Sequence, residues 1–195
     1  MEASARKREL DTRESEIAIK VPGFVYRLPQ ISQVLDLRRV CVLVRKPEST
    51  MSSLLRRGWF SDDVLKAGDI TWPNRFDTVV PAPHWVPRDR LTEWDSMTER
   101  DRAALYYITQ TELMAAVPAK MVVFDYQQMI SQPRALLELV AGRLGLAFGP
   151  CTDTLLNEVT VQDSTSRFDL KTVRKEFANR VPEVYAQATS HCVKL

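Results

Sequence analysis

Glycine is scarce in this chain of 195 residues, and the placement of the six that occur excludes two common nucleotide-binding loops. None falls in a G-x-x-x-x-G-K-S/T or a G-x-G-x-x-G arrangement, so the chain has no complete phosphate-cradling loop of its own. The three cysteines, at positions 41, 151 and 192, are odd in number and lack metal-like spacing, so they predict neither a disulfide framework nor a metal site. We therefore expect a cytoplasmic protein.

An excess of charge of one sign and long apolar runs are missing as well. The 27 Lys and Arg residues against 25 Asp and Glu residues leave a formal net charge of +2, which does not predict a nucleic-acid partner. No stretch approaches the roughly 18 to 20 apolar residues that a membrane span requires. Because 45% of the residues are hydrophobic and 27% charged, we expect residues 1–195 to form one globular domain.

Three short apolar runs are present, namely Ile17–Ile19, Val40–Val44 and Met121–Phe124. The last two are rich in β-branched residues and almost free of polar ones, which predicts strands buried on both faces of a parallel sheet. Stretches with apolar residues at helical spacing separate them. Alternating strands and helices predict an α/β fold with helices flanking the sheet. The expected helices span residues 28–37, 50–57, 98–116, 133–144 and 170–188.

Two regions stand apart from this alternation. Residues 58–98 hold four tryptophans and four prolines, a composition too irregular for a long helix. This insertion either lines a substrate site or packs its own tryptophans as a lid. It ends at Thr98, which with Asp101 resembles a helix capping box. Residues 150–195 are expected to form a C-terminal covering segment.

The segment after the second apolar run is a candidate anion site. Val44 ends the run, Arg45 follows, and a serine-rich helix start contains Ser52 and Ser53. Ligands of open α/β sheets bind outside the carboxyl ends of the strands, and an arginine offers a forked, permanently charged set of donors for a phosphate. The alternative is an arginine at an ordinary strand end followed by an ordinary helix cap.

Two further residues lie at predicted strand ends. Tyr126 follows the third run, where its ring and hydroxyl would contact a base; packing in the core is the alternative. Lys20 follows the first run, where an ammonium group would stabilise negative charge on a transferring group. A lysine at a strand end is otherwise simply solvated.

Taken in order, these sites resemble the sulfotransferase family, whose members use 3'-phosphoadenosine 5'-phosphosulfate (PAPS) and fold like P-loop kinases. Lys20-Val21-Pro22 is similar to the family's K-T-P, and the segment 45–53 is similar to R-D-P-R-D-V-x-x-S. The third similar stretch begins F-D-Y-Q-Q-M at 124–129 and ends R-L-G-L at 143–146. The resemblance covers about residues 17 to 148 and is weak over 58–98.

The resemblance implies a role for each matching residue. Arg45 and Ser53 would bind the 3'-phosphate of PAPS, Tyr126 would contact the adenine, and Lys20 would lie near the sulfuryl group. The acceptor would be the hydroxyl or amine of a small molecule or carbohydrate, residues 58–98 would shape its pocket, and the product PAP would leave without help from a metal. Residues 165–168 are similar to a T-S-F segment that lines the nucleotide in cytosolic members.

The sequence departs from the family in three ways. It has no first strand and P-K-S-G-T-T-W-type loop, it has Pro22 where cytosolic members have a histidine base, and it lacks a C-terminal R-K-G motif. We therefore expect an N-terminally truncated sulfotransferase. The alternative is a non-catalytic descendant that acts as a nucleotide-binding or partner-interaction module. In that alternative, the edge exposed by the missing strand would be covered by a homodimer partner or by a segment of another chain.

Overall fold

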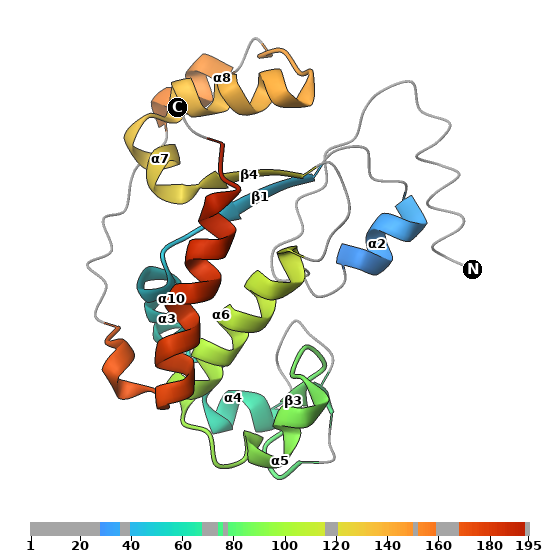
Figure 1. Ribbon diagram of the computed structural model, residues 1–195, viewed down its shortest axis with the longest axis vertical. Coiled ribbons are helices and arrows are strands. Elements are labelled where there is room, and N and C mark those ends of the chain that lie inside the picture. The colour runs from blue at the N-terminus through green and yellow to red at the C-terminus, as the bar shows by residue number, and fades with distance from the viewer. Residues whose placement is uncertain are drawn as a thin grey trace.

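A computed structural model describes residues 28–35, 40–67, 74–75, 78–115, 121–149, 152–158 and 168–193 (Figure 1). Lys20, the run 17–19 and residues 165–167 lie outside these ranges. The elements follow in the order α2 (Leu28–Leu35), β1 (Val40–Val44), α3 (Pro47–Arg56), α4 (Asp62–Ala67), β2 (Asn74–Arg75), β3 (Ala82–Pro83), η2 (Arg88–Arg90), α5 (Leu91–Trp94), α6 (Glu99–Ala115), β4 (Met121–Asp125), α7 (Tyr126–Ser131), α8 (Pro133–Leu144), α9 (Thr152–Glu158), η3 (Leu170–Thr172) and α10 (Lys175–Ser190).

The α/β class is confirmed, with a small parallel sheet among many helices. Strands β1 and β4 pair in parallel, with Val40 opposite Met121 and Val44 opposite Asp125. Beyond α10 the chain returns to β4, where the Val193 amide donates to the Val123 carbonyl at 2.8 Å. Because β1 and β4 run parallel, their carboxyl ends lie at the same edge of the sheet.

The expectation that β1 is buried on both faces is wrong. Val40, Val42 and Val44 are buried, whereas Cys41 is exposed and Leu43 is 44% exposed. Successive side chains of a strand point to opposite faces, so only one face of β1 is covered. Tyr185 and Ala188 of α10 belong to the residues packed on the buried face.

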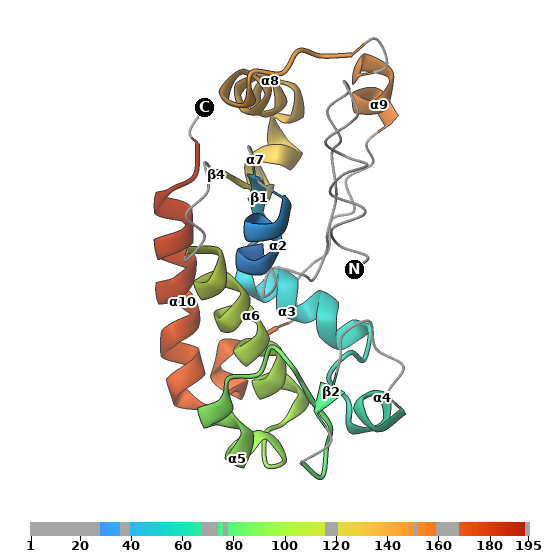
Figure 2. The ribbon, with the colours of Figure 1, turned by 90° about the vertical axis from the view of Figure 1, so that its right-hand side faces the viewer.

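Most of the hydrophobic core lies away from the sheet, where α6 packs against α3 and α10. Helices α6 and α10 run side by side in both views (Figures 1 and 2). Trp85 and Trp94 of the irregular insertion are buried in this core, with their rings 5.9 Å apart in an edge-to-face arrangement. These two tryptophans therefore pack inside the protein, in agreement with the alternative that the insertion packs its own tryptophans.

The helix boundaries follow local signals in the sequence. The capping box is confirmed, because the Asp101 carboxylate accepts from the Thr98 amide and the Thr98 hydroxyl accepts from the Asp101 amide, both at 3.1 Å. Helix α8 occupies the expected residues, from Pro133 at its first position to a left-handed Gly145 (φ 64°). Helix α3 begins at Pro47, earlier than expected, because proline is favoured at the first helical position.

Candidate functional site

Arg45 and Tyr126 meet at the carboxyl edge of the sheet. Each follows directly after its strand, and the strands end with Val44 opposite Asp125. The Arg45 guanidinium carbon lies 4.8 Å from the centre of the Tyr126 ring, within the range of a cation-π contact. The structure thus brings together two of the four predicted site residues, which are 81 positions apart in the sequence.

Ser53 lies in the second turn of α3, about 9 Å along the helix axis from Pro47. It is half-buried, and its hydroxyl makes no hydrogen bond within the described part of the chain. The neighbouring Ser52 lines a shallow hollow of about 180 Å³ together with Leu55, Arg100 and Phe168. This hollow is smaller than the pockets of roughly 300 to 1,000 Å³ that enclose whole drug-sized ligands.

Arg100 in this hollow was missed by the sequence analysis. Its guanidinium carbon lies 5.6 Å from the centre of the Phe168 ring, and one of its nitrogens donates to the Thr172 hydroxyl at 3.1 Å. Phe168 ends the segment that resembles T-S-F. No local signal could have revealed Arg100, because the contact joins residues about 70 positions apart.

Two tyrosines lie beside the strand ends. The Tyr107 hydroxyl donates to the Arg45 backbone carbonyl at 3.0 Å. Burial raises the pKa of Tyr107, and burial followed by the charge of Asp125 raises the pKa of Tyr185. Both hydroxyl groups therefore stay protonated at neutral pH. Asp125 itself caps α7, since its carboxylate accepts from the Gln127 amide at 2.9 Å.

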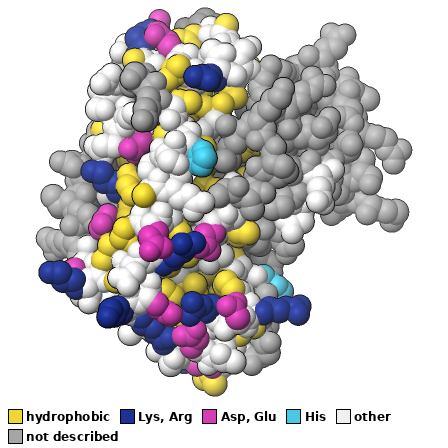
Figure 3. All heavy atoms as spheres, viewed as in Figure 1, with side chains coloured by type: hydrophobic (Ala, Val, Ile, Leu, Met, Phe, Trp, Pro, Cys, Tyr) yellow, Lys and Arg dark blue, Asp and Glu magenta, His cyan; other side chains and the backbone are white. Residues whose placement is uncertain are grey.

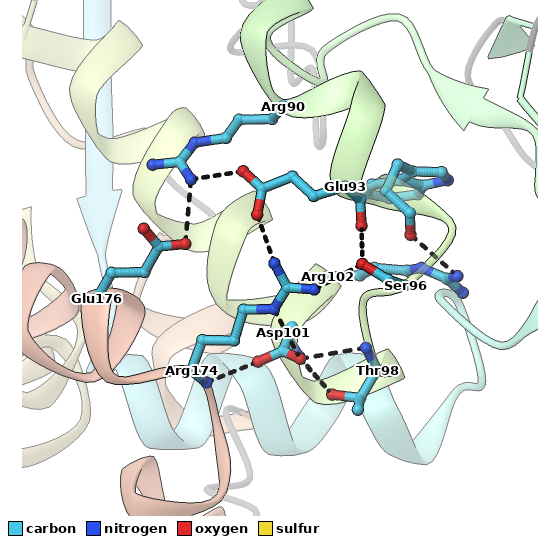
Figure 4. A network of polar contacts seen from close by, with 9 residues as sticks. Arg90, Glu93, Ser96, Thr98, Asp101, Arg102, Arg174 and Glu176 are labelled. Atoms are coloured by element: carbon cyan, nitrogen blue, oxygen red, sulfur yellow. Dashed lines mark hydrogen bonds and ion pairs between the residues drawn. The ribbon is translucent and has the colours of Figure 1, made fainter.

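A network of ion pairs holds α5, α6 and α10 together (Figure 4). Arg90 donates to Glu93 at 2.7 Å and to Glu176 at 3.0 Å, and Arg174 pairs with Glu93. The Arg174 amide also donates to the Asp101 carboxylate at 2.8 Å. That bond lies at the start of α10 and accounts for the break between η3 and α10, where the sequence predicted one continuous helix.

Arg102 anchors α6 from inside the core. It is 2% exposed, and it donates to the Phe60 carbonyl at 3.1 Å, to the Trp94 carbonyl at 3.3 Å and to the Asp62 carboxylate at 2.5 Å. The hydrogen bond from Arg102 lowers the pKa of Asp62. Because these charges are matched by partners within the protein, we assign Arg102 and the ion-pair network to stability rather than to catalysis.

The described residues show little further chemistry. On the face in Figure 3, Lys and Arg side chains are interleaved with Asp and Glu and form no extended basic patch among the coloured residues. Within the described ranges, no group of three or more His, Cys, Asp or Glu side chains is arranged to hold a metal ion. None of the helices described there has the length and apolar character to cross a membrane. Protein-family models, curated proteins and solved structures yield no match to this chain.

Proposed function

We propose that this chain is a sulfotransferase-type protein with a P-loop kinase-like fold. In this proposal it binds PAPS at the Arg45–Tyr126 edge and transfers the sulfuryl group to a hydroxyl or amine acceptor. The observation that carries the proposal is the contact between Arg45 and Tyr126 at the carboxyl ends of two adjacent parallel strands. This edge is where open α/β sheets bind their ligands.

The chemistry of the two side chains suits an adenosine phosphate. When the flat face of a guanidinium lies against an aromatic ring, the N–H groups at the edge of the guanidinium stay available. They can then donate to two phosphate oxygens at once. The Tyr126 ring offers a flat surface on which an adenine can stack. Arg45 would therefore take the 3'-phosphate and Tyr126 the base.

The second turn of α3 supplies further donors for the same ligand. The hydroxyl groups of Ser52 and Ser53 would hydrogen bond to phosphate oxygens, as would the guanidinium of Arg100 on the wall of the hollow. Phe168 also lines this hollow.

In the proposed reaction, the sulfur–oxygen bond to the phosphate of PAPS breaks while sulfur bonds to the acceptor oxygen or nitrogen. The acceptor's proton passes to a base, which the resemblance does not assign. Lys20, by resemblance, would stabilise the charge that develops on the leaving phosphate. Positioning and cation stabilisation would supply most of the rate enhancement.

A second candidate function is a nucleotide-binding or partner module without catalysis. The exposed Cys41 and Leu43 favour it, because an uncovered apolar strand face is a surface on which another chain can pack. A nucleotide-binding module would use the Arg45–Tyr126 edge without turnover, whereas a partner module would use the exposed strand face.

Labelled PAPS separates the two. The full chain is incubated with [35S]PAPS and a mixture of phenolic, amine and carbohydrate acceptors, and the release of PAP is followed together with label in the acceptors. Acceptor-dependent label that is absent from the Arg45→Ala variant supports the sulfotransferase. Saturable PAPS binding without transfer supports a nucleotide-binding module, and absence of binding contradicts the sulfotransferase and favours a partner module.

A further inference from the structure

Tyr107 links the middle of α6 to the backbone of the candidate site. Its side chain is buried, with the residue 6% exposed, and its hydroxyl donates to the Arg45 carbonyl at 3.0 Å. Arg45 is the first residue after β1, and one residue, Lys46, separates it from α3. The hydrogen bond therefore fixes the short connection from which the Arg45 side chain leaves.

Helix α6 is a rigid support for this bond. Its first turn is closed by the Thr98–Asp101 capping box, and buried Arg102 ties it to the carbonyls of Phe60 and Trp94. The helix also packs against both α3 and α10. The Tyr107 hydroxyl is therefore held in place by the core rather than by the site it contacts.

We infer that Tyr107 is a positioning residue for the 3'-phosphate site, holding the Arg45 backbone so that the guanidinium sits over Tyr126. The inference rests on the proposed nucleotide site and extends it to a residue that no motif singles out. Tyr107 touches no nucleotide, and its effect passes entirely through Arg45. Its loss would therefore weaken recognition of the 3'-phosphate more than recognition of the rest of the ligand.

Without the Tyr107 hydroxyl, the short connection between β1 and α3 loses the hydrogen bond that fixes the Arg45 backbone. Arg45 is half-buried, and in this partly buried position a carbonyl that loses its donor must find another partner, which allows the backbone to shift. Because the guanidinium stands at the end of a long side chain, a small rotation at the Arg45 backbone displaces it from the Tyr126 ring. A phosphate contact that depends on two parallel N–H donors is sensitive to such a displacement.

Tyr107→Phe removes only the hydroxyl, and Tyr185→Phe is its matched control. Tyr185 is a half-buried tyrosine that, like Tyr107, lies near Asp125 and Glu48, but its hydroxyl makes no hydrogen bond to Arg45. Dissociation constants for PAP and AMP are measured by calorimetry on the wild type and both variants. The temperature is chosen so that circular dichroism shows all three folded.

We expect Tyr107→Phe to weaken PAP binding roughly five-fold, the range of a single lost hydrogen bond, with AMP binding changed less than about two-fold. Tyr185→Phe should leave the ratio of the two constants at its wild-type value. A purely structural tyrosine would lower the melting temperature without moving this ratio, and that result overturns the inference. If Tyr107→Phe keeps the wild-type ratio of the PAP and AMP constants while Arg45→Ala loses the preference for PAP, the inference about Tyr107 is wrong. The proposed site at Arg45 then still stands. A wild type that does not prefer PAP to AMP overturns both.

Discussion

The guanidinium carbon of Arg45 lies 4.8 Å from the centre of the Tyr126 ring, although the two residues belong to strands far apart in the sequence. The parallel pairing of β1 and β4 in register creates this contact, since each residue is the first after its strand. The arrangement gives each side chain a separate role in binding an adenosine phosphate, and the two roles can be tested apart.

Arg45→Ala is expected to weaken PAP binding by roughly ten-fold to one-hundred-fold, the range for hydrogen bonds to a charged group. AMP lacks the 3'-phosphate, so its affinity should change less than about three-fold. Lys46→Ala is the matched control, because it removes an exposed neighbouring cation. Calorimetric titration measures all constants, and equal losses for PAP and AMP would argue against the assignment of Arg45.

Tyr126→Ala should weaken PAP and AMP alike, because both ligands carry the adenine that stacks on the ring. The expected loss is about five-fold to one-hundred-fold, the range for stacking of a base on an aromatic side chain. Tyr126→Phe keeps the ring and should bind almost as the wild type does. If Tyr126→Ala leaves both affinities unchanged, the residue only supports Arg45 and does not contact the base.

Gln110→Leu is expected to stabilise the protein. Gln110 on α6 is 6% exposed, and neither its amide nitrogen nor its amide oxygen has a hydrogen-bond partner among the described residues. Replacing this unsatisfied amide with a similar apolar volume should raise the free energy of unfolding by about 1 to 3 kcal/mol. Urea unfolding measures the change, with exposed Gln187→Leu as the neutral control. A lower midpoint for Gln110→Leu would mean that the amide has a partner after all.

Arg102→Met should destabilise the chain strongly. Removing the guanidinium leaves the carbonyls of Phe60 and Trp94 without their donor, at a cost of about 3 kcal/mol or more. Arg180→Met is the contrasting variant, because Arg180 is exposed and pairs with Glu112 and Glu183 on the surface, where ion pairs contribute little to stability. Comparable denaturation midpoints for the two variants would contradict the role of Arg102 as an anchor.

Alkaline pH should destabilise the folded chain through Tyr107 and Tyr185. Burial raises the pKa of both phenols in the folded state above the value of about 10 in the unfolded state. The folded state therefore holds these protons more tightly, and the stability this supplies is complete below about pH 10 and lost as the pH rises through the folded-state pKa values. Between about pH 8 and about pH 11, the urea midpoint should fall less for Tyr107→Phe than for the wild type. An equal fall would exclude Tyr107 as a source of the alkaline loss.

The elements with strong local signals could be predicted from the sequence. Pro133 and Gly145 delimit α8, and the β-branched run at Val40–Val44 forms a strand of the parallel sheet. From these the placement of Arg45 and Tyr126 at strand ends followed, whereas the contact between their side chains came only with the structure. The sequence could not predict which face of β1 is buried and which is exposed, because an apolar residue such as Leu43 occurs in either environment.

The contacts between distant segments could not be predicted. Arg174 pairs with Glu93, and Arg100 reaches Thr172, across separations that leave no periodic or local trace in the sequence. From the sequence alone, an arginine on a helix surface is expected to be solvated, because the position of the segment it contacts is not known. The hydrogen bond from Tyr107 to the Arg45 carbonyl is of the same kind, which is why the sequence analysis did not reach it.

The most direct measurement is a thermal melt of the full chain with PAP, with AMP in parallel. A ligand at about 100 times its dissociation constant adds roughly 2.7 kcal/mol to the stability of the folded state. For a chain of this length the melting temperature should then rise by roughly 5 to 10 °C. A rise with PAP that exceeds the rise with AMP is the predicted result. A cooperative melt that PAP does not shift, or that both nucleotides shift equally, would contradict a 3'-phosphate site at Arg45.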